Sequence, residues 1–179
     1  MNNSSTSPRI IIFGRPGGGK SSFALQLHQA TDIPLHHLDA HFYESNWIER
    51  DYEEFLEIQQ KIVDQDQWII DGNMGKSLDM RYRRATHFLH FNYPLWMCYY
   101  RIIKRRLWDK NPNIKDRAPE CDEIIQWKFL KYIWGFNRRV ASQLSILPMM
   151  YPNVKFIKIQ SDRDLEEIRR ELSNLIATK

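Results

Sequence analysis

The residues that most clearly point to chemistry lie near the start of the chain. Residues 14–21 read GRPGGGKS, which is the spacing G-x-x-x-x-G-K-[ST]. Glycines let successive backbone N–H groups converge on an anion, and a following helix adds the positive end of its dipole. In such a loop Lys20 supplies a charge for the outer phosphates and Ser21 an oxygen for Mg²⁺. An ordinary glycine-rich turn is the alternative, but the intact spacing favours a P-loop that binds a nucleoside triphosphate.

The sequence on either side of this loop has the pattern that the motif requires. The apolar run IIIF at 10–13 predicts a buried strand before the loop, and residues 22–28 are typical of an amphipathic helix after it. The residues predicted to contact the nucleotide here are Gly14, Pro16, Gly17, Gly18, Gly19, Lys20, Ser21 and Ser22.

Two aspartates end other predicted strands. Asp71 closes the run WIID at 68–71, where a carboxylate can orient Mg²⁺ beside the P-loop hydroxyl; a solvated strand end is the alternative. Asp39 closes LHHLD at 35–39. Because ligands gather at the carboxyl ends of parallel strands, we expect both aspartates to face the P-loop across one crevice. Asp39 could accept a proton from an attacking hydroxyl, hold a substrate hydroxyl or amine, or cap a turn, and the sequence leaves these roles open.

Histidines surround Asp39, at positions 36, 37 and 41. On a strand, His37, Asp39 and His41 would share one face, which raises the question of a metal site. Three ligands along one strand form a line rather than a tetrahedral cage, so we favour surface or partly buried histidines.

Arginines form three clusters. Arg101 and Arg105 lie four residues apart on a predicted helix at 95–108 and therefore share a face. The planar guanidinium group suits phosphate oxygens, and a kinase must neutralise charge on the transferred phosphoryl group. We expect most of the clustered cations to form a solvated basic surface and a minority to contact phosphate. The other clusters are Arg81, Arg83 and Arg84, and Arg138 with Arg139.

The composition is that of a single globular domain. The 179 residues are 42% hydrophobic and 27% charged, and the formal net charge is +4. This mild excess is compatible with phosphorylated substrates and too small alone to indicate nucleic acid. Two cysteines without paired or zinc-like spacing, no signal peptide and no membrane-length run predict a cytoplasmic protein. We expect a disordered segment at 1–8 and one domain at 9–179.

Predicted strands alternate with predicted helices along the chain. Strands are expected at 10–13, 35–39, 68–72, 87–91 and 154–159, and helices at 20–30, 51–66, 77–84, 95–108, around 129–144 and from 161 or 162. This alternation predicts an α/β fold with a parallel sheet and right-handed crossovers.

At several motifs the chain resembles the bacterial "DNA topology modulation" proteins, which are adenylate-kinase-like P-loop NTPases. The matching motifs are the P-loop, HLD at 37–39, WIIDGN at 68–73 and RIIKRRL at 101–107, and the resemblance extends from about Arg9 to about Leu172. It implies a three-layer α/β fold with a five-stranded parallel sheet in the order 2-3-1-4-5, and a short helical lid at about 107–138. Its first part, residues 107–123, is too short, and with one cysteine too poor in ligands, for the zinc-bearing lid of longer adenylate kinases.

The resemblance also implies roles for individual residues. It places Asp39 in an acceptor pocket, Arg101 and Arg105 at the nucleotide and lid, and residues 161–163 beside the adenine; either Arg138 or Arg139 would face the lid. The catalytic residues expected on all these grounds are Lys20, Asp39, Asp71 and Arg105, and the expected Mg²⁺ ligands are Ser21 and Asp71.

Two functions follow as hypotheses. The first is an ATP- and Mg²⁺-dependent phosphotransferase of the nucleotide or small-molecule kinase type, with an unknown acceptor. The second is an ATP-binding regulatory protein that affects DNA topology without kinase activity. Against the second, the sequence contains no helix-turn-helix, zinc finger or basic arm.

Overall fold

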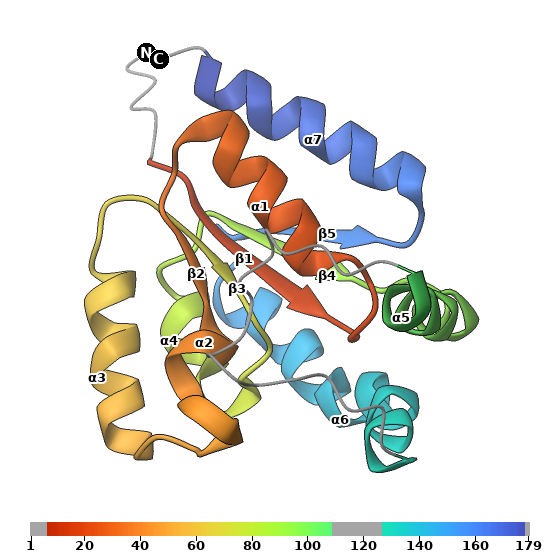
Figure 1. Ribbon diagram of the computed structural model, residues 1–179. Helices are drawn as coiled ribbons and strands as arrows, with labels where there is room; N and C mark the ends of the chain where they lie inside the picture. Colours follow the sequence, from red (N-terminus) through yellow and green to blue (C-terminus); the bar gives the residue numbers. More distant parts are fainter. Residues whose placement is uncertain (1–6, 109–126, 178–179) are drawn as a thin grey trace, which may run out of the picture.

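Five parallel strands form one sheet at the centre of the protein (Figure 1). The computed structural model describes residues 7–108 and 127–177. The strands are β1 (Arg9–Gly14), β2 (Leu35–His37), β3 (Trp68–Asp71), β4 (His87–Phe91) and β5 (Lys155–Ile159). Their order is β2-β3-β1-β4-β5, and every neighbouring pair is parallel. The predicted sheet and its strand order are therefore confirmed.

Helices cover both faces of this sheet. In Figure 1, α1 and α7 lie on one face, and α3, α4 and α6 lie on the other. Side chains of β1 alternate between the two cores that result: Ile10 and Ile12 pack on the α1/α7 side, Ile11 and Phe13 on the other. The helices are α1 (Lys20–Thr31), α2 (Leu38–Phe42), α3 (Tyr52–Val63), α4 (Leu78–Tyr82), α5 (Leu95–Trp108), α6 (Trp127–Met150) and α7 (Asp162–Ala177), with 3₁₀ turns at Ser45–Trp47 and Gly75–Ser77.

Two helix starts follow from capping residues in the sequence. The Asp51 carboxylate accepts hydrogen bonds from the backbone N–H groups of Glu53 and Glu54, as expected for the residue before α3. Before α7, the Ser161 hydroxyl accepts from the N–H of Asp164, whose carboxylate accepts in turn from the N–H of Ser161. This reciprocal pair makes Ser161 the cap, so α7 begins at Asp162, one of the two starts expected for this helix.

The second strand is shorter than predicted. We expected it at 35–39, but β2 ends at His37, and Asp39 lies in the first turn of α2. The cause is non-local: β2 pairs only with β3, and the last partners are His37 and Asp71. The next residue of the chain after β3, Gly72, has a φ angle of 145°, so β3 has no further residue in strand conformation with which β2 could pair. The expected line of His37, Asp39 and His41 along one strand face is therefore wrong.

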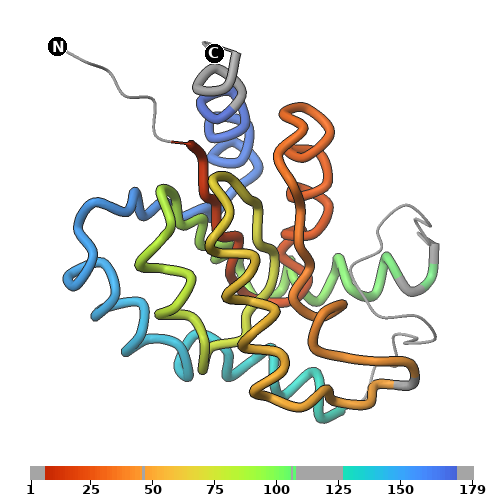
Figure 2. The backbone as a smooth tube through the Cα atoms, turned by 90° about the vertical axis from the view of Figure 1, so that its left-hand side faces the viewer, coloured from red at the N-terminus to blue at the C-terminus, as the bar shows by residue number. Residues whose placement is uncertain are grey.

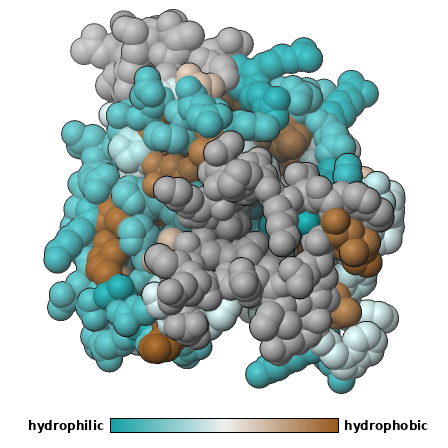
Figure 3. All heavy atoms as spheres, viewed as in Figure 1, coloured by the Kyte–Doolittle hydropathy of each residue, from teal (hydrophilic) through white to brown (hydrophobic). Residues whose placement is uncertain are grey.

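Helix α5 carries large apolar side chains on its outer side. Trp96, Tyr100, Ile103 and Leu107 follow helical spacing and are 50 to 66% exposed. Figure 3 shows hydrophobic atoms at the right edge of the molecule, where Figure 1 places this helix.

Within the described residues, no helix has the length and apolarity needed to cross a membrane. Most of the lid expected at 107–138 lies outside the described residues; from Trp127 onward its residues belong to α6.

The loop that leaves β3 is held by Arg81, whose side chain is fully buried. Its guanidinium group donates hydrogen bonds to the carbonyl oxygens of Gly72 (3.2 Å), Asn73 (2.9 Å) and Met74 (3.0 Å). Burial lowers the pKa of Arg81 to about 9, which leaves the group charged at neutral pH. Asn73 in turn accepts a hydrogen bond from the N–H of Gly14, 3.0 Å away. Arg81 is thus part of the protein interior, whereas Arg83 and Arg84 are exposed.

Replacing Arg81 by methionine is expected to reduce the free energy of unfolding by about 3 kcal/mol, because three buried carbonyl groups lose a charged donor. Urea unfolding followed by circular dichroism measures this loss. Arg83→Met serves as the control, since the Arg83 side chain makes no hydrogen bond to the described residues. Equal stability of the two variants would show that Arg81 does not support the loop.

The buried His90 side chain is expected to make the stability of the protein depend on pH. Its side chain is 6% exposed, lies between the rings of Phe13 and Phe156, and has an Nε2 atom with no partner among the described residues. Burial, with smaller contributions from Lys158 and Arg15, lowers its pKa from 6.5 to about 4. The unfolded chain therefore takes up a proton at a higher pH than the folded protein, and stability falls as the pH drops from 6.5 towards 4.

Between pH 7 and pH 5 we expect this single group to reduce the free energy of unfolding by about 2 kcal/mol. The His90→Phe variant keeps the shape and removes the titration, so its loss over the same interval should be smaller by that amount. His36, His41 and His87 have pKa values shifted in the same direction and are present in both proteins, so the difference isolates His90. Parallel pH curves for the two proteins would contradict this account.

Candidate functional site

The glycine-rich loop connects the central strand β1 to α1. Gly14, Gly17 and Gly19 have φ angles of 144°, 79° and 88°, which side chains rarely permit. At Gly17 an added Cβ would also lie 2.5 Å from the carbonyl oxygen of Cys98. Such alternation of left-handed residues before a helix is the geometry in which backbone N–H groups form an anion-binding concavity.

Lys20 and Ser21 line a cavity of about 1370 Å³ together with Pro16 and Gly17. The Lys20 ammonium group makes one long hydrogen bond, 3.4 Å, to the carbonyl oxygen of Arg15 in its own loop. Among the eight residues predicted to contact the nucleotide at 14–22, four lie outside this lining, and one of these, Ser22, is exposed. These four are Gly14, Gly18, Gly19 and Ser22.

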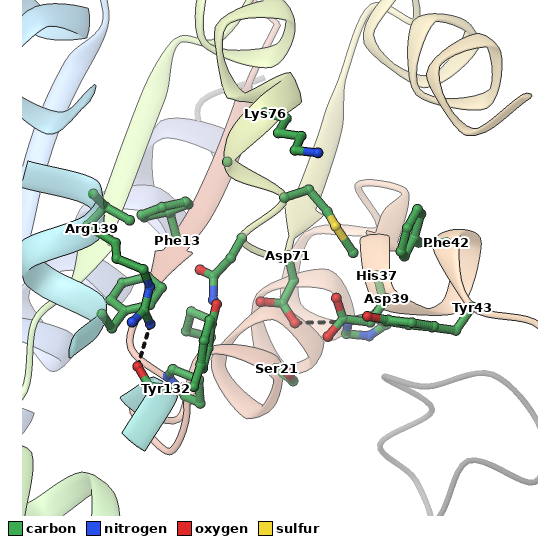
Figure 4. Close-up of a pocket in the computed structure, with 18 of the residues that line it drawn as sticks. Phe13, Ser21, His37, Asp39, Phe42, Tyr43, Asp71, Lys76, Tyr132 and Arg139 are labelled. Atoms are coloured by element: carbon green, nitrogen blue, oxygen red, sulfur yellow. Dashed lines mark hydrogen bonds and ion pairs between the residues drawn. The ribbon is translucent and has the colours of Figure 1, made fainter. Parts of the chain in front are cut away.

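Asp71 lines the same cavity and is 5% exposed. Its Oδ2 atom contacts Nδ1 of His37 at 3.0 Å, and its Oδ1 atom is buried without a hydrogen-bond partner among the described residues (Figure 4). A buried carboxylate oxygen that lacks a donor is costly, so this atom suits a cation. Mg²⁺ commonly takes one or two protein oxygens, and phosphate and water oxygens complete its shell. Ser21 and Asp71 fit that requirement.

The contact between His37 and Asp71 was missed at the sequence level, where His37 was interpreted as a surface or partly buried residue. It follows from the parallel register, in which His37 and Asp71 are the last paired residues of β2 and β3. The rings of His36 and His41 lie 5.7 Å apart, and burial followed by repulsion between neighbouring histidines lowers both pKa values. No cluster of three or more metal-ligating side chains occurs in the described part of the chain.

Asp39 lies on the same cavity as Asp71 and the P-loop, as expected for residues near the ends of parallel strands. It is exposed, and Figure 4 shows it beside His37 and Tyr43. Its charge reaches across the cavity, where it contributes to raising the pKa of Tyr132, although burial is the larger cause.

Aromatic side chains form two walls around Asp39. One wall comes from residues 42–47, and the opposite wall from α6, where the Arg139 guanidinium lies 4.4 Å above the ring of Tyr132 (Figure 4). Both arginines considered for the lid are exposed, but Arg139 lines the cavity and Arg138 does not. The sequence indicated Phe129 and Phe136 of the α6 wall, which lie in one stripe at helical spacing, but gave no signal for the wall at 42–47. The rings of the two walls belong to Phe42, Tyr43, Trp47, Phe129, Tyr132 and Phe136.

The arginines of α5 lie above the P-loop. Arg105 lines the cavity, and Arg101 donates hydrogen bonds to the carbonyl oxygen of Gly18 (3.1 Å) and to Oδ1 of Asp162 (2.7 Å). The guanidinium of Arg101 also stacks on Tyr93, 4.3 Å from the ring centre, and the Tyr93 hydroxyl donates to the same Asp162 oxygen. Hydrogen bonds from Tyr93 and Arg101 lower the pKa of Asp162. The P-loop, α5 and the start of α7 therefore meet at one point.

Comparison with known proteins adds information on the fold. No protein-family model matches the chain, and no curated protein matches its sequence. Solved structures do resemble it, among them shikimate kinase from Acinetobacter baumannii in complex with shikimate. That structure has a TM-score of 0.59 and 12% sequence identity, over 97% of this chain and 95% of the other.

Two further solved structures have similar coverage. A gluconokinase from Sinorhizobium meliloti 1021 has a TM-score of 0.54 and 16% identity, over 97% of this chain and 93% of its own. A sugar kinase from Janibacter sp. HTCC2649 has a TM-score of 0.51 and 16% identity, over 96% and 93% of the two chains. At these low identities the likeness concerns the fold alone: this chain has the fold of the P-loop kinases.

Proposed function

We propose that this protein is an ATP- and Mg²⁺-dependent kinase that transfers a phosphoryl group to a small molecule bearing a hydroxyl group. The observation that carries the proposal is the shared lining of one cavity, where Lys20 and Ser21 of the P-loop face Asp39 and Asp71. A triphosphate on the P-loop and a small molecule near Asp39 would thus lie in the same space. The shared fold supports the proposal, because the similar solved structures are named as kinases.

At the nucleotide end, the loop N–H groups and Lys20 would hold the outer phosphates. Ser21 and the buried Oδ1 of Asp71 would hold Mg²⁺, which would neutralise charge on the transferred group. His37 keeps the other Asp71 oxygen in place. Arg105 would approach the phosphates from α5, and the junction of Arg101 with residues 161–163 would border the adenine.

At the acceptor end, Asp39 is the proposed general base. The acceptor oxygen would attack the γ-phosphorus, the bond from that phosphorus to the ADP oxygen would break, and Asp39 would take the hydroxyl proton. The aromatic walls would pack against the acceptor and keep water from the phosphoryl group. The proposal includes a cytoplasmic location, which is supported by the use of ATP and by two cysteines without paired or zinc-like spacing in the sequence.

The second candidate is an ATP-binding regulator that affects DNA topology. The arginines at the far end of the sheet, Arg9, Arg83 and Arg84, favour it because they border a common cavity away from the P-loop. DNA binding that requires ATP and weakens with salt would support this candidate over the kinase. Phosphoryl transfer from labelled ATP to any member of a panel of nucleosides, nucleotides and small hydroxyl compounds would favour the kinase.

The Lys20→Ala variant is expected to bind ATP at least about tenfold more weakly, because a charged contact with phosphate is lost. Isothermal titration calorimetry measures the affinity. Stability should remain unchanged, since the Lys20 side chain makes only one long hydrogen bond in the described structure. Lys61→Ala, at an exposed position of α3, is the matched control. If Lys20→Ala binds ATP and transfers phosphate at the normal rate, the P-loop assignment is wrong.

The Asp39→Asn variant tests the acceptor end separately. With an acceptor identified from the panel, kcat should fall by about 10²-fold or more while the affinity for ATP stays the same, because only the proton acceptor is removed. Glu57→Gln, at an exposed position of α3, controls for loss of a negative charge. An unchanged kcat would exclude Asp39 as the base.

A further inference from the structure

A second cavity, of about 460 Å³, lies at the end of the sheet where the strands begin. Its lining comes from the start of β1, the turn between α4 and β4 and the loop between α6 and β5. Figure 2 shows these three backbone segments near one another. Arg9, Arg83 and Arg84 line it, together with Thr86, Tyr151 and Asn153. Because β1 runs from Arg9 to Gly14, this cavity and the P-loop lie at opposite ends of the same strand, roughly 17 Å apart.

Two of these arginines are held in fixed positions by backbone groups. Nε of Arg9 donates to the carbonyl oxygen of Arg84 at 2.5 Å, and Nε of Arg84 donates to that of Val63, the last residue of α3, at 3.2 Å. Each bond uses one of the five N–H donors of a guanidinium group. The Nη atoms of both side chains have no hydrogen bond or ion pair to the described residues, which leaves the forked ends available to a ligand.

The backbone around Arg9 is also fixed. Its N–H donates to the Thr86 hydroxyl at 2.9 Å, and its carbonyl oxygen accepts from the N–H of Thr86 at 2.8 Å. The arginine at the start of β1 therefore keeps its place relative to the turn that bears Arg83 and Arg84.

The positive charge of this cavity is not compensated by its lining. None of the described lining residues is acidic. Burial and the charge of Arg84 lower the pKa of Arg9, an effect that Asp66 partly opposes. Asp79, near the rim, already accepts the hydroxyl hydrogen of Tyr151 at 2.9 Å. Arginines that follow the end of α4 also interact with the helix dipole, but this does not explain Arg9, which belongs to a strand.

We propose that this cavity is a second anion site, which binds the phosphate group of a small phosphorylated molecule. One guanidinium group can donate two parallel hydrogen bonds to two oxygens of the same phosphate. Three guanidinium groups line this cavity, and none of its described lining residues carries a carboxylate. The volume accommodates a phosphate with a small organic part. The site is separate from the P-loop and does not depend on the kinase assignment.

The test uses the full chain with Lys20→Ala, so that binding at the P-loop is weakened in every arm, and binding is assigned to the second cavity by its loss in Arg83→Glu. Inorganic tripolyphosphate is titrated by calorimetry at physiological salt, and one binding site is expected. Adding Arg83→Glu should weaken binding at least about tenfold, because an attractive charge becomes a repulsive one. This substitution breaks no hydrogen bond within the described structure, so folding is preserved. Lys131→Glu, an equal change of charge at an exposed position of α6, should leave binding unchanged.

Two further titrations identify the source of the phosphate. Binding of ADP that is tighter than that of tripolyphosphate and is weakened by Arg83→Glu would assign the site to a nucleotide, and equal binding with the same dependence on Arg83 would assign it to the phosphate groups alone. The proposal is overturned if the Lys20→Ala protein does not bind tripolyphosphate, or if Arg83→Glu binds it equally well. It is also overturned if a short DNA duplex binds through Arg83 while tripolyphosphate does not, since the surface would then serve nucleic acid. Failure of kinase activity would leave these outcomes unaffected.

Discussion

At Gly14 the chain passes between two neighbouring strands with no space for a side chain. An added Cβ would lie 2.2 Å from the carbonyl oxygen of Phe91 in β4, and the φ angle of 144° is rarely available to other residues. On the opposite side, the N–H of Gly14 donates to Asn73 in the loop after β3. The start of the P-loop is therefore fixed from both sides. A side chain at Gly14 would separate β1 from β4 and displace Ser21 relative to Asp71.

The same contact joins the two halves of the candidate site. The Arg81 guanidinium holds the carbonyl groups of residues 72–74, and Asn73 of this loop holds the P-loop. Residues 72–75 also line the cavity near Asp39. One rigid loop thus supports both the nucleotide end and the acceptor end, so the distance between the two ends is set by the fold rather than by the substrates. The residue that stabilises this loop lies outside the cavity lining.

Local patterns in the sequence were sufficient for the P-loop and for the bounds of β4 and α5, whereas they left two possible starts for α7. The order of the strands was predicted only through family resemblance, because strand order is non-local. Pairing partners also decided where β2 ends and that His37 meets Asp71. Burial of Arg81 could not be predicted from its neighbours, since Arg83 and Arg84 have the same chemistry and are exposed.

Helical spacing could have separated Arg138 from Arg139. Phe136 belongs to the buried stripe of α6, and Arg139 lies three residues after it, which places the two on the same face of the helix. Arg138 follows Phe136 by two residues and points elsewhere. The position of a cationic residue relative to a predicted apolar stripe therefore indicates which member of an arginine pair reaches a cavity. The same reasoning does not apply to the arginines of the second cavity, because only the fold brings Arg9, at the start of β1, next to Arg83 and Arg84, in the turn after α4.

The row of apolar side chains along α5 affects how folding of this protein can be followed. Trp96, Tyr100, Ile103 and Leu107 offer a dye such as ANS an apolar surface while the protein is fully native. Dye binding is therefore not a sign of a partly folded state in this case. Total tryptophan emission has a related weakness, because Trp96, Trp127 and Trp134 are 66 to 72% exposed. Trp68 is fully buried in the core, and the near-ultraviolet circular dichroism of its ring is the signal that reports tertiary packing.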